Sequence, residues 1–414
     1  MERLEAVEIC AGAGGQALGL ERAGFEHALA VELDENACRT LKENRPGWKV
    51  AQGDVADVNV WNPAAFRGVE LLAGGVPCPP FSIAGKQLGA EDERDLFAWA
   101  VELVDVVQPK ALLLENVRGL SMPRFAGYRQ HVLDRLRDLG YVAEWKLLQA
   151  SDFGVPQLRP RFVLVALRPD DAQYFSWPDP QPETPTVGET LLDLMSADGW
   201  KQAEKWARGA NRIAPTIVGG SKKHGGADLG PTRAKRAWAE MGVDALGVAD
   251  KPPQPDDTFK VGPKLTTEMV ARIQGWSDDE YPWIFTGRKT SRYRQIGNAF
   301  PPPVAHAVGA AIVRALQHKG QPAERVSAEH DPIYRVLRDN GDYMNASQIE
   351  RALGVQLDVP ELERRISLLK RDFDVDTRED ARNPAYKLGK FKAFIGQEEH
   401  LRHDMFLKHR AKIS

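Results

Sequence analysis

Residues 6–23 read AVEICAGAGGQALGLERA, and this stretch decides the fold class. The apolar run Ala6–Cys10 leads directly into the glycine-rich Cys10–Gly15, and Gln16–Ala23 follows with apolar residues at roughly helical spacing. A strand, a glycine turn and a helix in this order form the first unit of a nucleotide-binding α/β sheet. A plain glycine-rich turn is the simpler alternative.

The same alternation continues through the first 170 residues. Further β-rich apolar runs lie at 28–33, 50–55, 69–74, 111–117, 142–149 and 162–167. Segments with roughly helical spacing lie between some of them, at 36–44, 95–107 and 128–139. Helices that alternate with strands cross over between parallel neighbours, so residues 1–173 are predicted to form a doubly wound, mostly parallel sheet.

Composition and charge restrict the class of protein. The chain has 414 residues, 43% of them hydrophobic and 27% charged, with a net charge of -3. This is a globular composition, and no apolar run of about 18 residues or basic leader peptide is evident. We therefore expect a cytoplasmic protein with no membrane partner. The three cysteines, Cys10, Cys38 and Cys78, lack paired spacing, so neither a disulfide framework nor a metal site is expected.

Residues 174–263 differ from the first region because proline, glycine and charged residues dominate them, and little regular secondary structure is expected there. Residues 201–240 hold nine Lys or Arg against three acids. Such a local excess predicts contacts with nucleic acid phosphates, although any single member is more often a solvated surface charge. The candidates are Lys222, Lys223, Arg233, Lys235 and Arg236.

A polar linker near residue 320 precedes a third module. Three short helices are predicted at 333–339, 346–353 and 362–370, and two strands at 373–378 and 386–392. This order suggests a winged helix. The near balance of acidic and basic residues leaves a packing or protein-contact role equally open.

Two acidic residues follow successive predicted strands. Glu32 ends the second strand and could accept hydrogen bonds from both ribose hydroxyls of a nucleotide. Asp54 follows the third strand, where it could accept a hydrogen bond from an adenine amino group. The alternative is that both carboxylates merely cap helices.

The fourth predicted strand runs into GGVPCPPFS at 74–82, where prolines hold Cys78 on a stiff loop at the ligand-binding edge. A lone cysteine is usually structural. Here, however, Phe81–Ser82, a glycine-rich stretch and RDLF at 94–97 follow it, and together these residues resemble the catalytic loop of the cytosine carbon-5 DNA methyltransferases.

The resemblance covers residues 6–315, with the motifs in the family's order. LLENV at 113–117 is similar to the family's Glu-Asn-Val motif, QLRPR at 157–161 to its Gln-x-Arg-x-Arg motif, and QIGNA at 295–299 to its closing motif. Taken alone, the first could be a strand end with a helix cap and the second a basic turn. Residues 214–218 resemble the Thr-plus-aliphatic pair near the flipped base, with an ordinary strand as the alternative.

The resemblance implies a methyltransferase that uses S-adenosylmethionine, with residues in three roles. The implied catalytic residues are Cys78, Glu115, Arg159 and Arg161. The implied cofactor-binding residues are Cys10, Ala11, Gly12, Gly14, Gly15, Glu32, Leu33, Asp54, Val55, Pro77, Asn298 and Ala299. The implied DNA contacts are Ser82, Gln87, Arg94 and Thr216, together with the five basic candidates above.

The chemistry of the reaction explains these residue types. Carbon 5 of cytosine becomes nucleophilic only after a thiolate, here Cys78, adds to carbon 6. Glu115 would donate a proton to the ring nitrogen, and Arg159 and Arg161 would bind the carbonyl oxygen of the base and a nearby phosphate. The attacked face is hidden in a duplex, so the base must be flipped out.

The sequence pattern and the resemblance together predict the domain organisation. A catalytic and cofactor domain spans 1–173, a target-recognition domain 174–275, a return segment 276–320 and an accessory module 331–414. Double-stranded DNA is the expected partner of a monomer, and a cognate restriction enzyme would be a genetic rather than a physical partner. A tRNA cytosine-5 methyltransferase and a catalytically silent DNA-binding regulator remain alternatives.

Two departures from the family pattern stand out. Cys10 occupies the place where the family usually has a phenylalanine that contacts adenine. Pro263 and Met269 replace an arginine and a glutamate around Leu265–Thr267, so support of the recognition region could differ.

Overall fold

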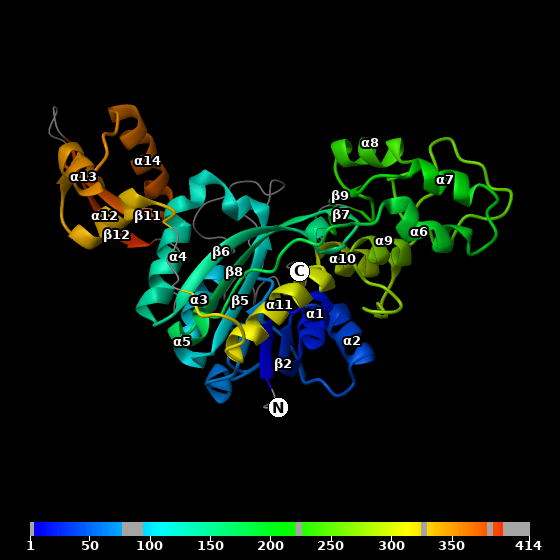
Figure 1. Cartoon of the computed structure of the whole chain (residues 1–414), viewed down its shortest axis with the longest axis horizontal. Helices are drawn as coiled ribbons and strands as arrows, with labels where there is room; N and C mark the ends of the chain where they lie inside the picture. The colour runs from blue at the N-terminus through cyan, green and yellow to red at the C-terminus, as the bar shows by residue number, and fades with distance from the viewer. Residues whose placement is uncertain (1–3, 77–93, 221–225, 324–328, 379–383, 392–414) are drawn as a thin grey trace.

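The computed structural model describes residues 4–76, 94–220, 226–323, 329–378 and 384–391. Its centre is a seven-stranded sheet with the order β3-β2-β1-β4-β5-β8-β6 (Figure 1). The strands are β1 Leu4–Ile9, β2 Phe25–Glu32, β3 Val50–Gln52, β4 Leu71–Gly74, β5 Ala111–Val117, β6 Val142–Gln149 and β8 Pro160–Leu167. Strand β8 runs antiparallel to both of its neighbours, and the other neighbouring pairs are parallel. The expected mostly parallel, doubly wound sheet is confirmed.

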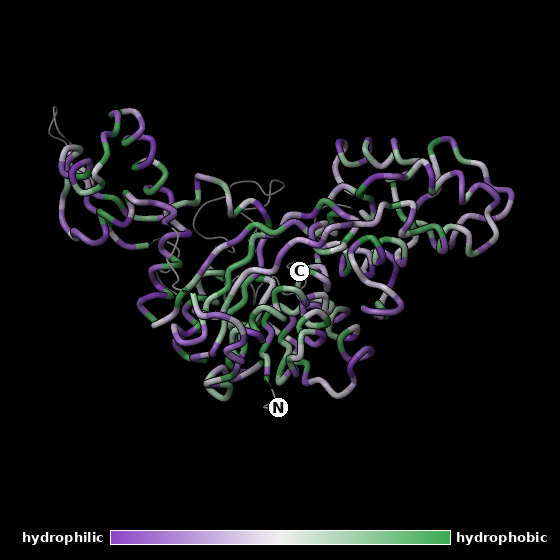
Figure 2. The backbone as a smooth tube through the Cα atoms, viewed as in Figure 1, coloured by the Kyte–Doolittle hydropathy of each residue, from purple (hydrophilic) through white to green (hydrophobic). Residues whose placement is uncertain are grey.

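Helices cover both faces of this sheet. They are α1 Gly15–Ala23, α2 Glu35–Asn44, α3 Arg94–Val107, α4 Ala126–Asp138 and α5 Pro169–Ala172. Short 3-10 turns lie at Pro63–Phe66, Arg118–Ser121, Pro123–Phe125 and Ala150–Phe153. Apolar side chains of α3 and α4 pack on one face, while α1 and α11 (Pro302–Leu316) pack on the other. Because both faces are covered, the central strands β4, β5 and β8 are largely apolar, whereas the edge strand β6 carries polar residues (Figure 2).

The strand order reverses between β1 and β4. From β1 the chain winds outward through β2 and β3, whereas β4 and β5 lie on its other side. The ends of β1 and β4 are level, since Ile9 is paired with Gly74. In open α/β sheets, ligands bind in the crevice at this switch point, beyond the carboxyl ends of the strands. The glycine loop after β1 and the cysteine loop after β4 both start here.

The region 174–263 contains more regular structure than the sequence predicts. It holds helices α6 Val187–Ser196, α7 Ala203–Gly209 and α8 Thr232–Glu240, with the short strand β9 Ala214–Pro215. The expectation of sparse secondary structure was wrong to this extent. Its physical reason is a separate apolar core, in which Leu191, Trp206 and Trp238 are buried together. Helix α9 Thr267–Ile273 closes the same core.

The chain then returns to the catalytic sheet through α10 Lys289–Asn298 and α11. Helix α11 lies against α1, where Gly19 permits close approach, because a Cβ at Gly19 would lie 2.5 Å from the Pro302 carbonyl oxygen. Residues 289–316 are long and apolar enough to cross a membrane by composition. Of their most apolar window, 56% is buried within the fold, as expected for core packing.

The C-terminal module consists of α12 Pro332–Asn340, β10 Met344–Asn345, α13 Ala346–Leu353, α14 Val359–Asp372, β11 Phe373–Arg378 and β12 Ala385–Phe391. Its strands pair antiparallel in the order β10-β12-β11. This is the element order of a winged helix. The module shares one apolar core with the catalytic sheet through α4, where His131 lies 4.5 Å from the Phe391 ring.

Figure 1 shows the relative placement of these parts. The C-terminal module and the region 174–275 rise on opposite sides of the sheet, and both stand toward its carboxyl edge. The carboxyl edge of the sheet therefore lies between these two regions.

Candidate active site

The glycine loop after β1 adopts a conformation that few residues tolerate. Cys10, Gly12 and Gly14 all have positive φ angles, of 51°, 56° and 93°. A Cβ at Gly14 would lie 2.6 Å from the Trp283 ring, so this position has no room for a side chain. Trp283 also donates a hydrogen bond from Nε1 to the Ala13 carbonyl oxygen, 2.8 Å away. The return segment thus supports the loop, a contact that no local sequence signal predicts.

Glu32 connects the end of β2 to this loop. Its Oε2 accepts a hydrogen bond from the Gly12 N–H at 2.7 Å, and its Oε1 accepts one from Asp34 N–H at 2.7 Å. Burial raises the pKa of the Glu32 carboxyl. With Leu33 as a third backbone donor, the carboxylate still retains a lone pair for a further donor. Glu32 therefore does not cap a helix, which was its alternative reading, because Asp34 caps α2.

The remaining predicted cofactor residues lie along the same edge. Asp54 follows β3 and accepts a hydrogen bond from Ala56 N–H at 2.9 Å. Beside it Val55 is buried, whereas Leu33 after β2 is exposed. Among the described residues, no three His, Cys, Asp or Glu side chains gather as a metal site would require.

The return segment closes the other side of the loop. A Cβ at Gly15 would lie 2.4 Å from the Phe300 carbonyl oxygen and 3.0 Å from the Ala299 Cβ. The adjacent Asn298 donates to the Gly220 carbonyl oxygen at 3.2 Å. The structure therefore brings Ala299, distant along the chain, to the glycine loop, whereas the printed contact of Asn298 is with Gly220.

The predicted nucleophile and part of its loop lie outside the described residues, namely Pro77, Cys78, Ser82 and Gln87, while the backbone of Arg94 starts α3. The approach to this loop is defined, however. Asn116, at the end of β5, donates from Nδ2 to the Val76 carbonyl oxygen at 3.1 Å. Asn116 thereby fixes the backbone immediately before Pro77.

Glu115 and Arg161 form a buried ion pair beside that backbone. The Arg161 Nε lies 2.5 Å from the Glu115 Oε1, and the two residues are 7% and 8% exposed. They meet because Arg161 of β8 lies opposite Val117 of β5, two residues from Glu115 on the same strand. Burial raises the pKa of the Glu115 carboxyl, although Arg161 and Arg159 oppose the shift. A buried carboxyl with a raised pKa takes up a proton more readily than an exposed one.

Arg159 has a different environment from Arg161, although the sequence predicts one role for both. Its side chain is 1% exposed, and Nη1 donates to the Ile217 carbonyl oxygen at 2.6 Å. Its Nη2 donates to the carbonyl oxygens of Gly297 and Ala299, at 2.7 and 2.9 Å. Arg159 thus joins three chain segments by their backbones. Its terminal nitrogens already have partners, so we no longer expect Arg159 to bind the base.

Two glutamines complete this junction and were not predicted as site residues. Gln157 donates from Nε2 to the Gln274 Oε1 at 2.6 Å and accepts at Oε1 from Ile217 N–H at 2.9 Å. Gln274 in turn donates to the Ala299 carbonyl oxygen at 2.9 Å. Gln157 belongs to the QLRPR segment, which was a usable signal, whereas Gln274 has no local signature.

The predicted DNA contacts fall into three groups. Lys222 and Lys223 lie outside the described residues. Arg233 and Arg236 are exposed on α8, whereas Lys235 pairs with Asp228 at 2.9 Å. Thr216 follows β9, which pairs parallel with β7 Gln157–Leu158. The strand pairing places Thr216 next to the arginine motif, where its hydroxyl donates to the Leu158 carbonyl oxygen.

Comparison with known proteins shows the family to which the chain belongs. The family model described as C-5 cytosine-specific DNA methylase matches residues 4–314, which is most of the chain. The chain belongs to this family. The methylase is therefore a DNA cytosine-5 methyltransferase, and the resemblance stated from the motifs is confirmed.

Individual relatives define how far the likeness extends. The methylase is 71% identical to the Type II methyltransferase M.NaeI of Lentzea aerocolonigenes over the full length of both chains. It is 52% identical to the Type II methyltransferase M.NgoMIV of Neisseria gonorrhoeae over 75% of this chain and 97% of that protein. Among solved structures, the Entamoeba histolytica methyltransferase EhMeth shares the fold, with a TM-score of 0.53 and 14% identity over 76% of this chain and 99% of that chain.

Proposed function

We propose that this methylase transfers the methyl group of S-adenosylmethionine to carbon 5 of a cytosine flipped out of double-stranded DNA, through a covalent Cys78 adduct. The observation that carries the proposal is the buried Glu115–Arg161 pair at the end of β5. The pair lies beside Gly75, where the cysteine loop starts after β4. The glycine loop follows β1, the strand that pairs with β4. The proposed proton donor therefore lies beside the switch point at which the glycine loop starts.

The residues act in a defined order. The Cys78 thiolate bonds to carbon 6 of the base, while Glu115 gives a proton to the ring nitrogen that pairs with guanine. The ring thereby becomes an enamine with electron density at carbon 5. S-adenosylmethionine supplies an electrophilic methyl group to that carbon. A base then removes the proton of carbon 5, the Cys78–carbon 6 bond breaks, and the ring nitrogen loses its added proton.

The surroundings of Glu115 suit this role. Its raised pKa favours the protonated carboxyl that a donor requires. Arg161 is the cation nearest to that carboxyl and can bind the carbonyl oxygen of the base once the base enters. Arg159 acts as a positioning residue in this proposal, since it connects the arginine motif with Ile217 and Ala299.

The cofactor binds along the edge formed by β1, β2 and β3. Glu32 accepts hydrogen bonds from the ribose hydroxyls, and Asp54 accepts one from the adenine amino group. The backbone of Cys10–Gly15 and the Asn298–Ala299 wall enclose the rest. These positions fit the cofactor because the Glu32 carboxylate keeps a free lone pair and the glycines leave no side chain in the way.

DNA lies over the carboxyl edge of the sheet, between the catalytic domain of 1–173 and a recognition domain of 174–275. Helix α8 contributes exposed cations for phosphates, and Thr216 lies near the arginine motif. The names of M.NaeI and M.NgoMIV support a role in a Type II restriction-modification system. The protein would then act in the cytoplasm as a monomer, beside a cognate endonuclease that it need not contact.

The test uses the purified enzyme, tritiated S-adenosylmethionine and two substrates, duplex DNA and tRNA. We expect methyl incorporation into DNA alone, and Cys78→Ser should abolish it while DNA binding persists. The matched control is Cys38→Ala, because burial raises the pKa of the Cys38 thiol to about 12 and keeps it unreactive.

Three results would contradict the proposal. Turnover of Cys78→Ser near the wild-type rate would exclude the nucleophile. Incorporation into tRNA alone would indicate the RNA enzyme, and absence of incorporation into any DNA would indicate a silent DNA-binding regulator. Bisulfite sequencing of DNA from a methylation-free host that expresses the chain would then give the target sequence.

A further inference from the structure

Gln16 carries a buried amide that lacks a hydrogen-bond partner among the described residues. It lies in the first turn of α1, directly after the glycine loop, and is 3% exposed. Neither Nε2 nor Oε1 has a hydrogen-bond partner in the part of the chain that the structure describes. A buried polar group left unsatisfied destabilises a fold, so such a group indicates a ligand or a missing contact.

The end of the Gln16 side chain points to the switch point of the sheet. A Cβ built on Gly75, just after β4, would lie 3.9 Å from the Gln16 Oε1 and 3.9 Å from the Cys10 carbonyl oxygen. The same point lies 3.5 Å from the Glu115 Oε2. The amide therefore occupies the narrow space between the glycine loop and the catalytic carboxyl.

The proposed function assigns side chains to the nucleoside part of the cofactor and to the target base along this edge. Glu32 and Asp54, on β2 and β3, accept the ribose and adenine. Glu115 and Arg161, on β5 and β8, accept the base. The α-amino-acid end of the cofactor must lie between these sets, near β1 and β4, and it is the group without a side-chain partner so far.

The chemistry of an amide suits that group. An α-amino acid presents an ammonium donor and a carboxylate acceptor side by side, and a carboxamide carries one acceptor and two donors. We propose that Gln16 binds the α-amino-acid end of S-adenosylmethionine and of its product S-adenosylhomocysteine. This inference rests on the proposed function.

The test compares two ligands by titration calorimetry with the full-length protein. S-adenosylhomocysteine carries the amino-acid end, and 5′-methylthioadenosine lacks it. In Gln16→Leu we expect S-adenosylhomocysteine to bind about tenfold more weakly, as the loss of one hydrogen bond to a charged group predicts, while 5′-methylthioadenosine binds as in wild type. The control Gln356→Leu, at an exposed position of the C-terminal module, should change neither affinity.

A thermal melt of the ligand-free protein separates ligand binding from a structural role. Gln16→Leu removes an unsatisfied amide, so its melting temperature without ligand should equal or exceed that of wild type. A structural hydrogen bond would instead make the variant melt lower. Gln16→Met, which follows the length of the original side chain, repeats the measurement if the branched leucine does not fit.

The inference is overturned if the variant weakens both ligands equally, if it weakens neither, or if it weakens only DNA binding. A lower melting temperature in the ligand-free Leu and Met variants would also overturn it. Failure of the wild-type protein to bind S-adenosylhomocysteine would instead count against the proposed function itself.

Discussion

The charged side chains of the catalytic edge and those of the region 174–275 lie in opposite environments. Glu115, Arg159 and Arg161 are buried and hold fixed partners. Arg233 and Arg236 lie exposed on one helix. Chemistry on a base needs preorganised groups in a dry site, whereas phosphate contacts gain from reach and adaptability. Burial, rather than charge, therefore separates the side chains proposed to act on the base from those proposed to contact phosphates.

The largest effect on methyl transfer is expected at the buried Glu115. In Glu115→Gln we expect methyl transfer to fall by about 10²–10⁴-fold, because the proton donor is lost while the shape of the side chain is kept. Single-turnover incorporation of tritiated methyl measures the effect. Glu70→Gln is the matched control, since Glu70 pairs with Lys110 at the opposite, amino end of β4. A Glu115→Gln rate within tenfold of wild type would refute the assignment.

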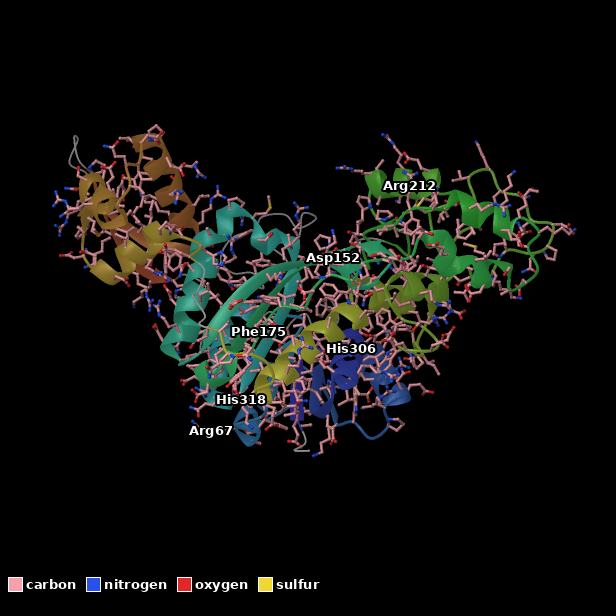
Figure 3. The ribbon with its side chains drawn as sticks, in the orientation of Figure 1. Arg67, Asp152, Phe175, Arg212, His306 and His318 are labelled. Carbon is pink, nitrogen blue, oxygen red and sulfur yellow. The ribbon has the colours of Figure 1, made fainter. Side chains whose placement is uncertain are left out.

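The next largest effect concerns the stability of the Arg159 junction. Arg159→Met leaves the buried carbonyl oxygens of Ile217 and Gly297 without their donor and removes one of the two donors of the Ala299 carbonyl oxygen. We expect the free energy of unfolding to fall by about 3 kcal/mol or more. Arg212→Met is the control, because Arg212 forms an exposed pair with Glu240 worth less than about 1 kcal/mol. Figure 3 labels Arg212, which lies in the region 174–275. Equal urea midpoints for the two variants would contradict the stabilising role of Arg159 at this junction.

Exposed cations on α8 should act on DNA affinity alone. In the double variant Arg233→Gln with Arg236→Gln, the slope of log Kd against log salt concentration should fall by about 2, roughly 0.9 for each lost phosphate contact. Lys235→Gln should change the slope less, because Asp228 already neutralises that charge. Fluorescence anisotropy with a duplex at several salt concentrations measures both. An unchanged slope in the double variant would place the phosphate contacts elsewhere.

The smallest effect on methyl transfer is expected at His131, where α4 contacts the C-terminal module. Burial, together with Arg338 and Arg135, lowers the pKa of His131 to about 4. The unfolded chain binds this proton more readily, so the stabilisation is complete above pH 6.5 and is lost as the pH falls toward 4. That loss is roughly 3 kcal/mol.

His131→Phe keeps the ring packing against Phe391 and removes the titration. Urea melts across pH 4–7 should show a shallower loss of stability than in wild type, with activity near neutral pH almost unchanged. The same pH dependence in both proteins would assign the titration to other groups.

Local sequence determined much of the catalytic half. Strands β5 and β6 have the bounds that the sequence predicts. For β5 the reason is that a strand buried on both faces needs a nearly unbroken apolar segment. The glycine loop and the order of the motifs identified the family, since each motif is short and contiguous. The three helices α6, α7 and α8 were missed, because frequent proline and glycine masked a small tryptophan core.

Only the tertiary structure decided what the long-range partners are. Arg159 and Arg161 lie two residues apart, and the sequence treats them alike. Strand β7 ends before Arg159 and β8 begins after it, so one guanidinium turns toward Ile217 and the other toward Glu115. The contact of Trp283 with the glycine loop is equally long-range, and so is the burial of the Gln16 amide, which has no partner within the described ranges. Such contacts join residues that are distant along the chain, and local periodicity carries no information about them.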